Sequence, residues 1–245
     1  PIALPAHPNT AMNHPAWIRR SRYFCAKGLF LALSVFFAFA SLAAAAPARA
    51  ESGPDTGATI TFRKVFKSSY PEFVEIKLSE SGSGTWDIRA LDEEPSPQPF
   101  QIGQPLTQKI YDLAGRLHDF AGVDLEIHRR IASLGEKTFR YEKNGQTHEV
   151  TFNYTLDPSG AELLDIFEGL ARQELDLSDL QRTMRYDRLG VNDVLVRIDA
   201  DYTEKLLPES DSFLPVLDQI AADDKLIDMA RQRARNLAAR IRASH

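Results

Sequence analysis

The residues best suited to chemistry lie in the segment VDLEIHRR, residues 123–130. Asp124, Glu126 and His128 alternate there, so an extended backbone would place all three side chains on one face. Carboxylates and imidazoles are ligands for divalent cations. We therefore treat these three residues as candidate metal ligands. The same spacing fits an acidic surface loop with a solvated histidine, which is the interpretation we favour.

Other signatures of catalysis are missing from the sequence. It has no Gly-x-Ser-x-Gly, no His-Glu-x-x-His, no phosphate-binding glycine loop and no dinucleotide fingerprint. No residue is therefore indicated as catalytic or cofactor-binding, and we expect no cofactor. An enzyme whose site is assembled from distant residues stays open, although a non-enzymatic protein is favoured.

The string RYDRLGV, residues 185–191, is the most unusual in the chain. Two arginines, a tyrosine and an aspartate near a helix end could form a buried ion-pair staple between two helices. The same residues could instead recognise a partner. We favour the staple. The arginines of the last helix are spread around it, which is typical of a solvated helix end.

The first 50 residues have the pattern of an export signal. Met12 is the expected start, and a basic segment precedes the uncharged stretch Gly28–Ala46. Ala48-Arg49-Ala50 then matches a signal peptidase site, so we expect cleavage after Ala50. The alternative is an uncleaved membrane anchor formed by Gly28–Ala46. Both interpretations place residues 51–245 outside the cytoplasm, in the periplasm or secreted.

Charge and cysteine content limit what residues 51–245 can do. The first 50 residues hold five of the 29 basic residues, none of the 34 acidic ones and the single cysteine. The remainder therefore carries 24 basic and 34 acidic residues, a net charge of −10. This acidity argues against nucleic acid as a partner. Disulfides, thiolate catalysis and cysteine-bound zinc are excluded from this part.

A hairpin is the clearest structural element of the sequence. Two alternating runs flank Asn144-Gly145 within residues 137–155. Both central residues of a type I′ turn need positive φ, which asparagine and glycine adopt most readily. A two-residue loop fixes the register, which places Tyr141 opposite His148 and Phe139 opposite Val150.

Periodicity on either side of the hairpin predicts an α+β protein. Three alternating segments, at residues 58–67, 73–78 and 85–91, predict a meander. Residues 106–120 have helical spacing and predict one helix covering an antiparallel sheet of about five strands. Residues 157–245 predict four or five helices, the first two divided at a cap on Ser178. The sheet-rich half, residues 51–156, and the helical half are expected to pack as one domain.

These features favour an exported, non-enzymatic binding or interaction protein of the cell envelope. Its partner would be an envelope or extracellular protein, and it would meet a membrane only if the apolar N-terminal segment were retained. The alternative is a metal-assisted hydrolase built around Asp124, Glu126 and His128.

Overall fold

The computed structural model describes residues 57–67 and 69–244, which belong to one compact unit, residues 51–245. The expected export signal, its cleavage site and the alternative anchor lie outside the described residues. Within the described part, no helix combines the length and apolarity needed to cross a bilayer.

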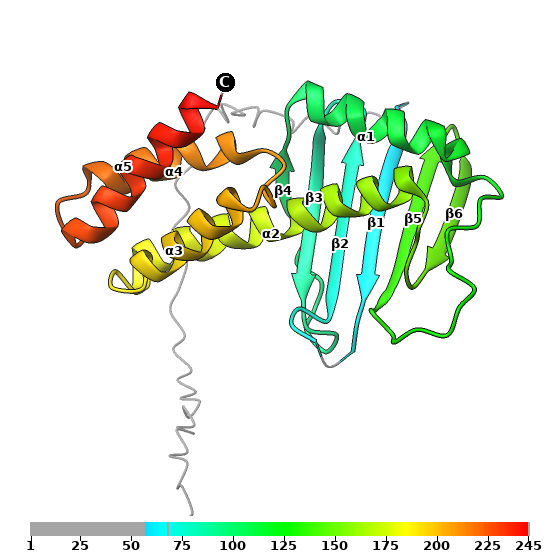
Figure 1. Cartoon of the computed structure of the whole chain (residues 1–245), viewed down its shortest axis with the longest axis horizontal. Coiled ribbons are helices and arrows are strands. Elements are labelled where there is room, and N and C mark those ends of the chain that lie inside the picture. Colours follow the sequence, from blue (N-terminus) through cyan, green and yellow to red (C-terminus); the bar gives the residue numbers. More distant parts are fainter. Residues whose placement is uncertain (1–56, 68, 245) are drawn as a thin grey trace, which may run out of the picture. The chain divides into compact units, whose positions relative to one another are not determined.

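The described residues form a six-stranded antiparallel sheet with strand order β4-β3-β2-β1-β5-β6 (Figure 1). The strands are β1 (Thr59–Val65), β2 (Phe73–Ser79), β3 (Ser83–Arg89), β4 (Gln98–Gln101), β5 (Glu136–Lys143) and β6 (Gln146–Phe152). Strand β4 is the one that the sequence pattern missed. It is short, contains Pro99 and lies at an edge of the sheet, where a missing N–H group breaks no ladder.

The predicted hairpin is confirmed, together with its register. Asn144 and Gly145 have φ angles of 51° and 78°, as a type I′ turn requires. Lys143 pairs with Gln146 and Phe139 pairs with Val150. Strand β5 also pairs with β1, so the hairpin joins the first meander in one continuous sheet.

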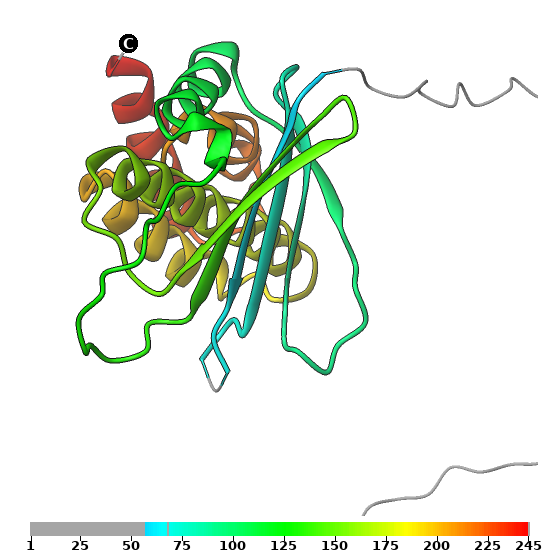
Figure 2. The same ribbon diagram turned by 90° about the vertical axis from the view of Figure 1, so that its right-hand side faces the viewer.

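Helices α1 (Gln104–Arg116) and α2 (Pro158–Tyr186) cover the same face of this sheet (Figures 1 and 2). The expected single covering helix is therefore joined by a second. Asp157 caps α2, because its Oδ1 accepts a hydrogen bond of 2.8 Å from the Gly160 N–H. Aromatic rings fill the interface: Phe62 lies 5.7 Å from Phe139 and 5.4 Å from Phe167, measured between ring centroids.

Helix α1 ends earlier than its apolar spacing predicts, at Arg116 rather than Phe120. His118, Asp119 and Phe120 follow with φ angles of 55°, 51° and 65°. The left-handed region costs a residue other than glycine about 1–2 kcal/mol. Burial offsets this cost, since the turn places the Phe120 ring in the core, 5.4 Å from that of Phe139.

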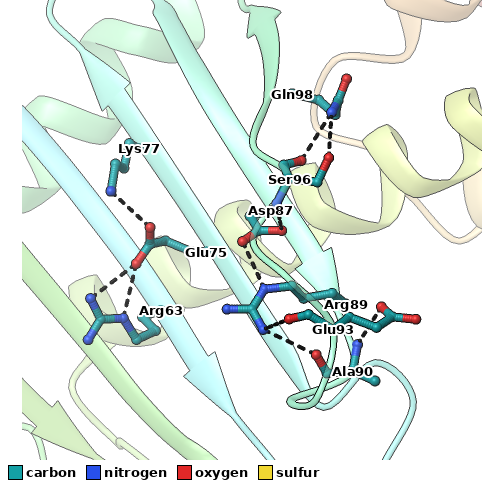
Figure 3. A network of polar contacts seen from close by, with 9 residues as sticks. All are labelled: Arg63, Glu75, Lys77, Asp87, Arg89, Ala90, Glu93, Ser96 and Gln98. Carbon is teal, nitrogen blue, oxygen red and sulfur yellow. Dashed lines mark hydrogen bonds and ion pairs between the residues drawn. The ribbon is translucent and has the colours of Figure 1, made fainter. Parts of the chain in front are cut away.

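The opposite face of the sheet carries polar side chains, and no described helix covers it (Figure 2). Glu75 accepts from Arg63 at 3.1 Å and pairs with Lys77 at 2.9 Å (Figure 3). Asp87 pairs with Arg89 at 3.0 Å. This is the pattern of an antiparallel sheet with a polar second side. Asp87 is buried there, because its Oδ1 also accepts from the Ser96 N–H of the loop between β3 and β4.

Helix α2 is continuous, so the prediction of two helices divided at Ser178 is wrong. Its 29 residues give a rod of about 43 Å. The apolar stripe is interrupted by the buried polar residues Gln173 and Asp176. Distant residues bind them: Gln173 Oε1 accepts from the Glu209 N–H at 3.1 Å, and Asp176 Oδ1 pairs with Arg197 at 2.7 Å, while Asp176 Oδ2 has no hydrogen-bond partner among the described residues.

The second half of α2 packs with three further helices, α3 (Val191–Thr203), α4 (Leu214–Ala222) and α5 (Asp228–Ala243). They enclose a second apolar core, which includes Leu180, Leu195, Phe213, Leu217 and Leu237. Neither Asn192 nor Ser212, whose side chains are typical of N-caps, caps a helix. Asn192 lies inside α3, and Ser212 belongs to a 3-10 turn, Ser210–Phe213, before α4.

The arginines of α5 are not simply solvated, as their distribution had suggested. Arg240 pairs with Asp199 of α3, and Arg242 pairs with Asp218 of α4 at 2.6 Å. Arg233 donates to Asn192 Oδ1 at 3.3 Å. These contacts hold α5 against its neighbours.

Candidate functional site

The structure brings two of the three candidate metal ligands together. His128 Nε2 lies 2.7 Å from Asp124 Oδ2 in the exposed loop before β5. This hydrogen bond is the main cause that raises the pKa of His128 and lowers the pKa of Asp124. Glu126 is directed elsewhere, because its Oε2 accepts from the Asn153 N–H at 2.5 Å.

The segment therefore lacks a ligand set ready for a metal. Asp124 and His128 use the atoms that would bind a cation to bind each other. Among residues 57–67 and 69–244, no group of three or more histidine, cysteine, aspartate or glutamate side chains is placed to hold a metal ion. Metal binding by Asp124, Glu126 and His128 stays a hypothesis.

Lys137 is a buried cation that the sequence did not single out. Its Nζ donates to the carbonyl oxygens of Leu134, Gly135 and Asn153 at 3.0, 3.1 and 2.8 Å. Burial lowers the pKa of this amine. Because all three ammonium protons have partners, its role is to fasten the loop before β5 to the end of β6.

Two partly buried carboxylates, Glu209 and Glu174, lie where the helical half meets the sheet. Glu209 Oε1 accepts from the Gly103 N–H at 2.6 Å, at the N-terminus of α1, whose own residues provide no side-chain cap. Glu209 Oε2 is buried without a hydrogen-bond partner in the described structure. Burial is the main cause that raises the pKa of both Glu209 and Glu174, and the two negative charges also repel each other. The hydrogen bond between Glu209 and Gly103 joins residues far apart in the sequence.

Every residue of the turn between α2 and α3, Arg185–Leu189, is exposed, so the predicted buried ion-pair staple is wrong. Tyr186 and Leu189 are 82% and 73% exposed. Within the described residues, Arg185 and Arg188 have no ion pair or hydrogen bond. The remaining interpretation of RYDRLGV, partner recognition, is the one that fits this exposure.

The α2–α3 turn is nevertheless well ordered by local bonds. Asp187 ends α2 by donating its N–H to the Thr183 carbonyl at 2.8 Å. Its side-chain Oδ1 accepts from the Gly190 N–H at 3.1 Å. A Cβ atom at Gly190 would meet the Asp187 carboxylate, which would have to shift. The aspartate thus shapes the turn and leaves the arginines unpaired.

A second turn with exposed apolar side chains lies at the same end of the helical half, where α4 leads into α5 (Figure 1). Met229 is 61% exposed and Ile227 is 40% exposed. The hydrogen bond between Arg233 and Asn192 ties the start of α5 to the start of α3. A hollow lined by Arg185 and residues of α4 connects the end of α2 to the end of α4.

No family model matches the chain, and no curated protein has significant sequence similarity to it.

Proposed function

We propose that residues 51–245 act outside the cytoplasm as a non-enzymatic binding protein of the cell envelope. The α2–α3 turn is the surface that meets the partner. The observation that carries this proposal is the exposure of Tyr186 and Leu189 beside Arg185 and Arg188, which bind no side chain or backbone group in the described part of the chain. Tyrosine and arginine are enriched among the residues that dominate binding energy at protein interfaces.

The order of the turn supports the same role. A surface that is already held in shape loses little conformational entropy on binding. The α2–α3 turn has this property, because Asp187 bonds both to the last turn of α2 and to Gly190. Met229 and Ile227 extend the apolar part of the surface on the neighbouring turn.

The charges indicate the chemistry of the partner. Residues 51–245 are acidic overall, yet the exposed turn presents Arg185 and Arg188 without acidic neighbours bound to them. A partner protein with carboxylates around an apolar depression would complement both the guanidinium groups and the Tyr186 and Leu189 side chains.

Site-specific photocrosslinking in cells of the native host tests the proposal. A photoreactive phenylalanine analogue replaces Tyr186 in one sample. In a matched control it replaces Tyr70, which is 89% exposed and lies on the sheet-rich half. We expect one discrete adduct from position 186 and none from position 70. Arg188→Glu should abolish the adduct, whereas Arg130→Glu, at another exposed arginine, should preserve it.

Equal crosslinking from both positions would contradict the proposal, as would an adduct that Arg188→Glu leaves unchanged. The absence of any adduct from position 186 would also contradict the proposal.

The second hypothesis is a metal-assisted hydrolase at Asp124 and His128. Their contact of 2.7 Å in a shallow hollow beside α2 is the observation in its favour. Metal binding by all three residues would require Glu126 to give up its hydrogen bond with the Asn153 N–H.

A further inference from the structure

The apolar face of the sheet continues past its covering helices. Helix α2 crosses β1, β2 and β3, and the strand ends next to the β1–β2 loop project beyond it (Figure 1). Between those ends and α2 lies a hollow of about 310 Å³, here termed the β1–α2 hollow. Its floor is apolar and consists of Val74 and Ile88, with the fully buried Phe62 beneath them, and Leu175 of α2 forms one side.

Described residues of the β1–β2 loop close the other side of the β1–α2 hollow. Phe66, Tyr70 and Pro71 line it there. Ser69 Oγ lies 2.6 Å from the Phe66 carbonyl oxygen and 2.7 Å from the Pro71 carbonyl oxygen, so Ser69 contacts the residues on either side of it. The hollow is thus bounded by side chains from strands, a helix and a loop.

Three charged side chains stand at the rim. Lys64 and Glu168 bind each other at 2.7 Å, so their charges are matched. Arg172 is different: its only partner among the described residues is Asp201, and the 3.8 Å from Nε to the Asp201 oxygen is too long for a hydrogen bond. The five N–H donors of this guanidinium are therefore open to a ligand.

We propose that the β1–α2 hollow binds a small amphipathic anion. The apolar body of the ligand would lie on Val74, Ile88 and Leu175, and its carboxylate or sulfonate would accept two hydrogen bonds from Arg172. The volume sets the size class. It equals that of about ten water molecules at roughly 30 Å³ each, which suits a small organic molecule rather than a folded partner.

The test uses 8-anilinonaphthalene-1-sulfonate, an aromatic sulfonate whose fluorescence rises in apolar sites, with the whole of residues 51–245. Arg172→Gln removes the rim guanidinium. Arg182→Gln is the matched control, because Arg182 is an exposed arginine on the same helix outside the hollow. We expect Arg172→Gln to weaken probe binding about tenfold or more, the effect of losing charge-assisted hydrogen bonds. Arg182→Gln should leave the dissociation constant unchanged.

Competition separates the charge of the ligand from its apolar body. Octanoate and 1-octanol share the same chain, and only octanoate carries a charge. We expect octanoate to displace the probe at a lower concentration than octanol from the parent protein, and at a similar concentration from Arg172→Gln.

A substitution that fills the hollow tests the proposal independently of Arg172. Ala171 lines it, so Ala171→Phe should remove probe binding while the circular dichroism spectrum stays unchanged. If that variant does not fold, the two glutamine variants alone decide. Equal affinities for Arg172→Gln and Arg182→Gln, or octanol competing as well as octanoate against the parent protein, would overturn the proposal.

Discussion

Replacing Glu209 by alanine should weaken the join between the two halves of the protein. The Glu209 carboxylate caps α1 from the helical half by accepting the Gly103 N–H at 2.6 Å. Loss of a helix N-cap costs about 0.5–2 kcal/mol, and loss of a negative charge at a helix N-terminus costs about 0.3–1 kcal/mol. We expect Glu209→Ala to lower the free energy of unfolding by about 1–2 kcal/mol. Part of the loss is offset because the alanine variant no longer pays the desolvation cost of the carboxylate.

Glu209→Gln is the matched comparison. Its amide oxygen can still accept from Gly103, and it removes the charge whose second oxygen is buried without a partner. We expect this variant to unfold within about 0.5 kcal/mol of the parent at neutral pH, because the lost charge–dipole interaction and the relieved desolvation oppose each other. Urea unfolding measures both variants. In a melting experiment, the alanine variant should lose about 2–8 °C for a chain of this size.

The pH dependence of the same comparison has a definite sign. Burial raises the pKa of Glu209 in the folded state, so the folded protein binds this proton more tightly than the unfolded chain does. The charged form opposes folding above the folded pKa. This penalty disappears as the pH falls through the folded pKa toward the ordinary value of 4.5. The parent should therefore gain stability relative to Glu209→Gln on acidification.

Two results would refute this account of Glu209. One is an equal loss of stability in the alanine and glutamine variants, which would mean that the hydrogen bond to Gly103 contributes nothing. The other is a difference between the parent and Glu209→Gln that stays constant or reverses its sign as the pH falls.

Four further predictions follow from the structure and the sequence. Asn144→Val should reduce stability by about 1–2 kcal/mol in urea unfolding, because a β-branched residue resists positive φ; an unchanged midpoint would mean that the hairpin turn contributes little. Lys137→Met should cost at least about 2 kcal/mol in the same assay, since three carbonyls lose their donor, and a neutral result would contradict its role as a fastener. N-terminal sequencing of protein from the native host should begin at Glu51, whereas a chain that retains Gly28–Ala46 would favour the membrane anchor. Elemental analysis should find no stoichiometric divalent metal; a bound metal whose removal by EDTA lowers the melting temperature, and which His128→Ala fails to bind, would favour the hydrolase.

Local patterns in the sequence predicted the sheet-rich half well. The Asn144-Gly145 turn and the alternation around it are short-range signals, and they placed every pair of the hairpin correctly. The cap at Asp157 is equally local. Strand β4 was missed because an edge strand of four residues with a proline has almost no periodicity to detect.

The helical half was harder because its buried polar residues depend on distant partners. Gln173 and Asp176 resemble surface residues in the sequence, which made α2 seem to stop. The Glu209 N–H and the Arg197 side chain that bind them come from later in the chain. No local pattern could reveal these contacts.

The candidate sites divide along the same line. The spacing placed Asp124 and His128 on one face, and they are in contact. It could not show that the Glu126 carboxylate would instead accept a hydrogen bond from the Asn153 N–H, directly after β6. The exposure of RYDRLGV depends on where α2 ends relative to its neighbours. The β1–α2 hollow brings together residues of three separated segments and had no sequence signal.

Helix α2 also determines how this protein can be divided and recombined. Its first half supplies Leu163 and Phe167 to the core under the sheet, and its second half supplies Leu180 to the core of the helical half. A cut before α2 would uncover the sheet, and a cut after it would uncover α3, α4 and α5. Residues 51–245 should therefore behave as a single unit, both when gene segments recombine in evolution and when the protein is expressed.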